Sequence, residues 1–136
     1  MDGFFSQNGH PIISIEVYGF SKEVTQKFDA MLDTGFSGFL SLPLVYAFKV
    51  GLILASTASF TLADGSTDNT LLCFGGIKLN GEEQAGLISV SKGSDILLGM
   101  EFLRKFKKKL HLDCENNTVR LENTEKTTTP IIVPRQ

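Results

Sequence analysis

Residues 31–43 read MLDTGFSGFLSLP and form the most informative stretch of the chain. The tripeptide Asp33-Thr34-Gly35 lies between two short, largely apolar runs, Phe28–Leu32 and Phe39–Leu42. This context predicts a tight loop held between two strands. The triplet alone is a weak signal, because average composition produces D-[ST]-G by chance in roughly one chain in twenty of this length. An Asp in an ordinary turn at a strand end would look the same.

Short runs of β-branched and aromatic residues dominate the rest of the chain and predict an all-β domain. Asn80-Gly81 is the strongest hairpin signal. Helix is expected only at 44–49, followed by Gly51, and at 100–106. We expect roughly ten short strands that close into a small barrel. The predicted strands are 12–18, 24–32, 39–42, 58–62, 70–74, 77–79, 85–90, 96–99, 110–113 and 118–122.

Length and charge exclude several classes of protein. The chain has 136 residues, of which 42% are hydrophobic, and a formal net charge of -2. This length fits one domain, and the balanced charge argues against a nucleic-acid partner. The sequence contains no run of 18 apolar residues, so we expect no membrane-spanning helix and no membrane partner. The basic run Arg104–Lys109 is interpreted as a solvated face rather than a nucleic-acid patch.

The cysteines and histidines point to no metal or redox chemistry. Cys73 and Cys114 are too far apart for a metal motif and too few for a disulfide framework, so we expect both to be reduced and structural. His10 and His111 have no ligand spacing, and the sequence has no Gly-rich phosphate loop, so we expect no metal and no cofactor. Residues 1–7 do not read as a signal peptide. The reduced cysteines favour a cytoplasmic protein.

A second apolar strand, Ile96–Gly99, precedes the helix-like segment 100–106. Together with the DTG triplet and the Ala63-Asp64-Gly65-Ser66 turn, it resembles the retropepsin-like (clan AA) aspartic proteases, single-domain relatives of pepsin. The similarity is greatest to the small bacterial members. It covers residues 9–122, which we expect to be the protease domain, with N-terminal and C-terminal tails at 1–8 and 123–136. The resemblance implies a closed acid-protease β-barrel that forms a two-fold homodimer.

The resemblance also implies how peptide bonds would be hydrolysed. One carboxylate activates a water molecule, and a second, protonated carboxyl group donates to the substrate carbonyl. Two carboxyl groups about 3 Å apart share one proton, because both cannot ionise together. The chain has only one D-[ST]-G triplet. We therefore expect the site on the two-fold axis of a homodimer, with one Asp33 from each chain.

The same resemblance implies roles for the neighbours of Asp33. Thr34 would hydrogen-bond across the two-fold axis, and Gly35 would let the backbone approach the carboxylate closely. Either residue could instead be a plain turn residue. Phe36 and Ser37 would contact the substrate. The Phe36 ring could crowd a subsite, and Ser37 stands where retroviral enzymes carry an Asp.

Two further positions bear on substrate closure and on the dimer. The turn Ala63-Asp64-Gly65-Ser66 would form the tip of a flap that closes over the substrate, unless it is an ordinary surface hairpin. Met100 stands where retroviral enzymes have an Arg that braces the dimer, so this dimer must be held differently.

Two functions remain open from the sequence. The first is an aspartic endopeptidase acting on a peptide or protein substrate. The second is a catalytically silent, protease-like dimeric binding module, which a cleft filled by Phe36 and a short flap would favour.

In the C-terminal tail, Ile131–Val133 fits either a loose extension or an edge strand against a partner subunit.

Overall fold

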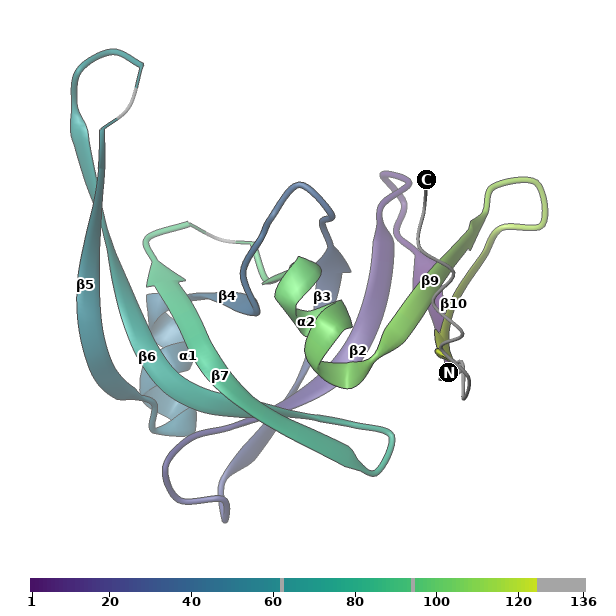
Figure 1. The fold of residues 1–136 in the computed structure, drawn as a ribbon, viewed down its shortest axis with the longest axis horizontal. Coiled ribbons are helices and arrows are strands. Elements are labelled where there is room, and N and C mark those ends of the chain that lie inside the picture. The colour runs from purple at the N-terminus through teal and green to yellow at the C-terminus, as the bar shows by residue number, and fades with distance from the viewer. Residues whose placement is uncertain (62, 94, 125–136) are drawn as a thin grey trace, which may run out of the picture.

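The computed structural model of the chain describes residues 1–61, 63–93 and 95–124. Within them, one ten-stranded sheet curls around an apolar core, with two short helices, α1 (Leu44–Val50) and α2 (Met100–Phe106) (Figure 1). The predicted all-β class is confirmed. Both interpretations of Ile131–Val133 concern residues outside this description. The strands are β1 (Asp2–Phe5), β2 (Pro11–Tyr18), β3 (Thr25–Leu32), β4 (Leu40–Pro43), β5 (Ile53–Thr61), β6 (Thr67–Leu79), β7 (Glu82–Ser91), β8 (Leu97–Leu98), β9 (Lys108–Asp113) and β10 (Thr118–Asn123).

One additional strand pairing closes the barrel. The sheet order is β5-β6-β7-β4-β8-β3-β2-β1-β10-β9, and β6 also pairs with β2. This pairing runs antiparallel from Glu16↔Lys78 to Tyr18↔Gly76 and completes a ring of β2, β3, β8, β4, β7 and β6. Gly76 is needed there, because a Cβ would lie 2.6 Å from Cε1 of the Tyr18 ring. The predicted closed barrel is therefore confirmed.

The core follows from alternation along the strands. In β2, Ile13, Ile15 and Val17 are buried, and the residues between them are more exposed. Alternate side chains of a strand point to opposite faces, so this period of two buries one face of β2. In β3 the same pattern buries Phe28, Ala30 and Leu32.

Strand β1 lies in residues 1–8, which we expected to be a tail. It pairs with β2 through Phe4↔Ile12 and with β10 through Gly3↔Val119. The approach at Gly3 is close, because a Cβ there would lie 2.6 Å from Cδ1 of Ile13. These contacts join the N-terminal segment to the barrel and to the β9–β10 hairpin.

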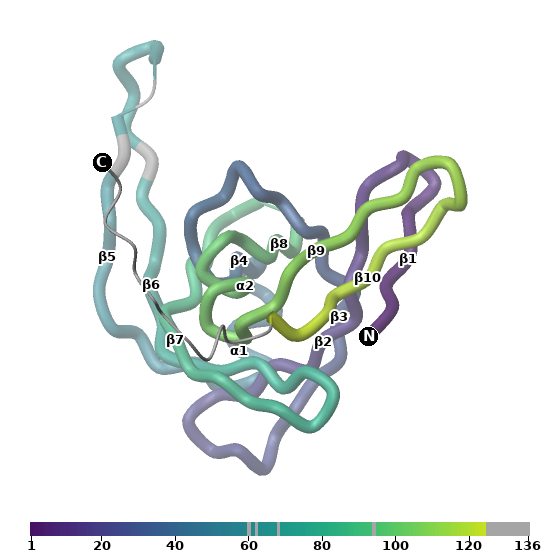
Figure 2. The backbone as a smooth tube through the Cα atoms, turned by 45° about the vertical axis from the view of Figure 1, so that its right-hand side comes forward, coloured from purple at the N-terminus to yellow at the C-terminus, as the bar shows by residue number. Residues whose placement is uncertain are grey.

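The β5–β6 hairpin is longer than predicted and rises beyond the barrel (Figures 1 and 2). The predicted strands 70–74 and 77–79 merge into β6, although Gly75 and Gly76 separate them in sequence. Both glycines stay paired with β7, as Gly75↔Gly86 and Gly76↔Ala85, and Gly76 also pairs with Tyr18 of β2, which keeps the strand continuous. The Asn80-Gly81 turn is confirmed, and both residues have positive φ, 50° and 86°.

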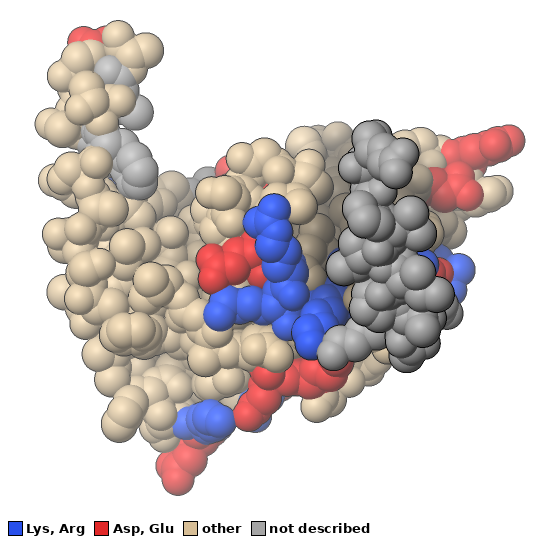
Figure 3. Space-filling view, viewed as in Figure 1, with Lys and Arg blue, Asp and Glu red and all other residues tan. Residues whose placement is uncertain are grey.

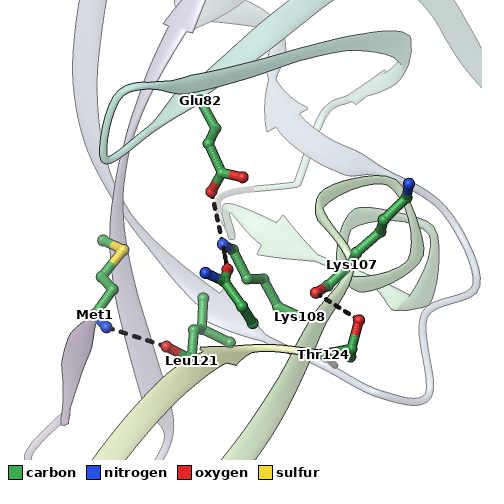
Figure 4. Close-up of polar contacts among 7 residues, drawn as sticks. Met1, Glu82, Lys107, Lys108, Leu121 and Thr124 are labelled. Atoms are coloured by element: carbon green, nitrogen blue, oxygen red, sulfur yellow. Dashed lines mark hydrogen bonds and ion pairs between the residues drawn. The ribbon is translucent and has the colours of Figure 1, made fainter. Parts of the chain in front are cut away.

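The basic run Arg104–Lys109 is only partly solvated. Lys and Arg side chains gather over α2 and the start of β9 (Figure 3). Lys105 Nζ donates to Ala85 O at 3.0 Å. The Lys108 side chain is only 8% exposed and binds Glu82 Oε2 at 2.6 Å and Asn123 Oδ1 (Figure 4). These two lysines tie the C-terminal part of the chain to β7.

Both cysteines are free. Cys73 is buried in β6, and burial raises the pKa of its thiol. Cys114 is exposed in the β9–β10 turn, so the expected structural role fits Cys73 alone. Among the described residues, no helix is both long enough and apolar enough to cross a membrane.

Leu98 provides a test of the barrel interior. Its side chain is 0% exposed in β8, between β3 and β4. We expect Leu98→Ala to lower the free energy of unfolding by about 2–5 kcal/mol, because the cavity it leaves cannot fully collapse. Urea unfolding at fixed protein concentration measures this change.

The matched control is Leu54→Ala, at a side chain that is 57% exposed. This change should alter the free energy of unfolding by no more than about 0.5 kcal/mol. Equal effects of the two substitutions would contradict the assigned core.

Candidate active site

The Asp33 loop leaves the barrel where three strands meet. Strand β8 lies parallel to β3 (Leu32↔Leu98) and antiparallel to β4 (Leu40↔Leu98). The connection from β3 to β4, residues 33–39, must therefore pass over the end of β8. The Asp33 N–H donates to Leu98 O at 2.9 Å, which fixes the backbone of Asp33 on the barrel.

Local hydrogen bonds orient the Asp33 carboxylate. Gly35 N–H donates to Asp33 Oδ1 at 2.9 Å, and Phe36 N–H donates to Asp33 O at 3.0 Å. A Cβ at Gly35 would lie 3.1 Å from Oδ1, so the glycine keeps this approach open. Asp33 is half-buried, whereas Thr34 and Gly35 are exposed. The carboxylate is thus held by its own loop at an accessible surface.

The first turn of α2 holds the other side of the loop. Met100 N–H donates to Phe36 O at 2.8 Å, and Glu101 N–H donates to Ser37 O at 3.3 Å and to Gly38 O at 3.1 Å. The first N–H groups of a helix have no partner within the helix, and here loop carbonyls satisfy them. At Gly99, a Cβ would collide with Phe36 O and Gly38 O. The loop and the helix can approach this closely only because residue 99 is glycine.

The Phe36 ring lies against Gly38 of its own loop and against Gly99. Its atoms would lie 2.5 Å from a Cβ at Gly38 and 2.7 Å from one at Gly99. Ser37 is exposed on the same loop. The structure therefore groups five predicted site residues, 33–37, on one segment. Substrate contacts by Phe36 and Ser37 remain predictions.

The other four predicted site residues form the tip of the β5–β6 hairpin. Ser66 donates to Asp64 Oδ1 from its N–H at 2.9 Å and from its hydroxyl at 2.6 Å, and Gly65 has φ of 85°. Ala63 and Ser66 are exposed, as are the two residues between them. The tip stands clear of the β3–β4 loop in both ribbon and tube views (Figures 1 and 2). Within this single chain, the two groups are not in contact.

Asp33 lines none of the five cavities described on the single chain. The cavity of about 600 Å³ beside β2 and the β6–β7 turn, for example, is bordered by Glu16, Lys27 and Lys78. In the described part of the chain, no three His, Cys, Asp or Glu side chains gather as metal ligands would. One accessible carboxylate can act as an acid or a base, but a proton-sharing pair needs a second carboxyl group.

The hairpin tip gives a prediction about pH. Hydrogen bonds from the Ser66 hydroxyl and N–H lower the pKa of the Asp64 carboxyl. A lowered pKa in the folded state means that this turn is stabilised above the pKa of an unfolded Asp, about 3.9, and loses that contribution as the pH falls through the folded pKa. We expect the Ser66 amide resonance in NMR to titrate with a midpoint below that of an unstructured Asp. A midpoint at or above the unstructured value would contradict the turn geometry.

No family model and no curated protein matches the sequence. Solved structures do match the fold. The EIAV protease complexed with the inhibitor HBY-793 has a TM-score of 0.58 and 16% identity, with 79% of this chain and 98% of that chain covered. The Simian Foamy Virus (mac) protease has a TM-score of 0.52 and 15% identity, with 68% of this chain and 91% of that chain covered. These matches show that the chain has the retropepsin-like fold.

Proposed function

We propose that this chain is an aspartic endopeptidase that works as a homodimer, with Asp33 of each chain forming the catalytic pair. The observation that carries the proposal is the setting of Asp33. Its backbone is bonded to Leu98, its Oδ1 accepts from Gly35, and its carboxylate lies at an accessible surface. The chain has no second D-[ST]-G triplet, so a second copy must supply the other carboxyl group.

The proposed reaction uses a water molecule between the two carboxyl groups. The ionised Asp33 takes a proton from the water, whose oxygen attacks the peptide carbonyl carbon, while the protonated Asp33 donates to the carbonyl oxygen. The Asp33 that took the water proton then donates it to the amide nitrogen, the other Asp33 takes a proton back from a hydroxyl of the tetrahedral intermediate, and the C–N bond breaks. Gly35 N–H keeps the carboxylate oriented, and the exposed Thr34 is available to the partner subunit.

The β5–β6 hairpin would serve as the flap, with Ala63–Ser66 closing over the peptide. Residues 50–77, which cover β5 and all of β6 except Lys78 and Leu79, contain two Asp and no Lys, Arg or Glu. Figure 3 shows few charged side chains on the β5–β6 hairpin and a basic surface over α2. A wall with few charges and no Lys, Arg or Glu in residues 50–77 favours extended, apolar peptide segments as substrates.

Asp33→Asn should abolish cleavage while the fold is kept. The amide cannot take a proton from water, so we expect kcat/KM on a peptide library to fall by roughly 10³-fold or more. Asp29→Asn is the matched control. Asp29 is exposed on β3, the strand that leads into Asp33, and its carboxylate accepts from Ser14 Oγ at 2.6 Å, a bond that an amide oxygen can still accept. Full activity of Asp33→Asn would refute the mechanism. A well-folded wild-type dimer without activity would instead indicate a binding module.

Mixing active and inactive chains tests the shared site. In an equal mixture of wild type and Asp33→Asn, random exchange leaves only about a quarter of the dimers with two Asp33 carboxylates. We expect activity to fall below that of the same amount of wild type alone, in step with subunit exchange followed by native mass spectrometry. Activity that stays proportional to wild-type chains would place the whole site in one chain.

A further inference from the structure

We infer that Phe36 is a positioning residue for Asp33, and that its ring braces the catalytic loop against the start of α2. The consequence for catalysis rests on the function proposed above. The structural part stands alone, because the ring occupies the space beside two glycines from different segments, Gly38 of the loop and Gly99 at the start of α2.

The Phe36 ring lies very close to the backbone at residues 38 and 99. A Cβ at Gly38 would lie 2.5 Å from the ring Cζ and 2.7 Å from Cε1, and one at Gly99 would lie 2.7 Å from Cδ2. Real Cβ contacts are essentially never this short, so the ring fills the positions that side chains at 38 and 99 would take. The brace therefore links the loop to the helix through side-chain packing.

The backbone of Phe36 transmits this packing to the carboxylate. Its N–H donates to Asp33 O at 3.0 Å, and its carbonyl accepts from Met100 N–H at 2.8 Å. A shift of the ring would disturb both bonds, one leading to Asp33 and the other to α2. Because reaction rates are sensitive to misplacement on the scale of 1 Å, such a shift would slow catalysis.

The obstacles that a Cβ atom would meet differ between Gly38 and Gly99. Neither has a positive φ, so backbone conformation does not require glycine at either position. At Gly38 the three nearest obstacles to a Cβ are all atoms of the Phe36 ring. At Gly99 two of them are backbone carbonyls, Phe36 O and Gly38 O, which no side-chain substitution removes.

This difference defines a double-mutant experiment. We expect Phe36→Ala and Gly38→Ala each to lower kcat by roughly ten- to a hundred-fold, with KM within about three-fold of wild type. Phe36→Ala/Gly38→Ala should be no slower than Phe36→Ala alone, because the added methyl group then meets no ring. Phe36→Ala should not rescue Gly99→Ala. Phe36→Leu should recover part of kcat.

Amide hydrogen exchange of residues 33–38 provides a readout that needs no activity. Phe36→Ala should speed exchange in this segment and leave exchange in β2 and β3 unchanged. Two results would overturn the inference. One is Phe36→Ala with wild-type kcat and loop exchange, and the other is a rise in KM alone, which would make Phe36 a substrate-binding residue. If the wild type cleaves no peptide, the proposed function fails, while the exchange data still test the brace.

Discussion

The crossing of the Asp33 loop over Gly99 is the contact on which the rest of the site depends. Here the N–H groups of Met100 and Glu101 meet the carbonyls of residues 36–38 at 2.8–3.3 Å. Each such bond contributes about 0.5–1.5 kcal/mol, and a buried group left unpaired costs more. Since β8 immediately precedes Gly99, one short segment fixes the loop both to the barrel and to α2. Any side chain at 99 would separate them.

Local sequence signals predicted most of the barrel. The alternation in β2 and β3, the Asn80-Gly81 turn and the two helices followed from neighbouring residues. The errors occurred where distant segments decide the structure. Strand β1 has only four residues and is held by Val119, far along the chain. Strand β6 continues through Gly75 and Gly76 because both pair with β7 and Gly76 also pairs with Tyr18 of β2, far away in sequence.

The DTG motif predicted which residues form the candidate site. It did not predict how these residues are arranged. The DTG triplet placed Asp33, Thr34 and Gly35 together, and the structure bears out a tight loop there. Nothing local indicated that the Phe36 ring would turn onto Gly38 and Gly99, since Gly99 lies more than sixty residues away. The proposed two-fold axis is harder still to predict, because it would involve surfaces of two chains.

In the proposed homodimer, catalysis would depend on assembly, because one copy would supply only half of the acid–base pair. The most direct test is the distance between the two Asp33 carboxylates in a crystal structure of the dimer. The account predicts about 3 Å, close enough for one shared proton. Carboxylates too far apart to share a proton, in a well-ordered dimer, would contradict the proposed catalytic pair.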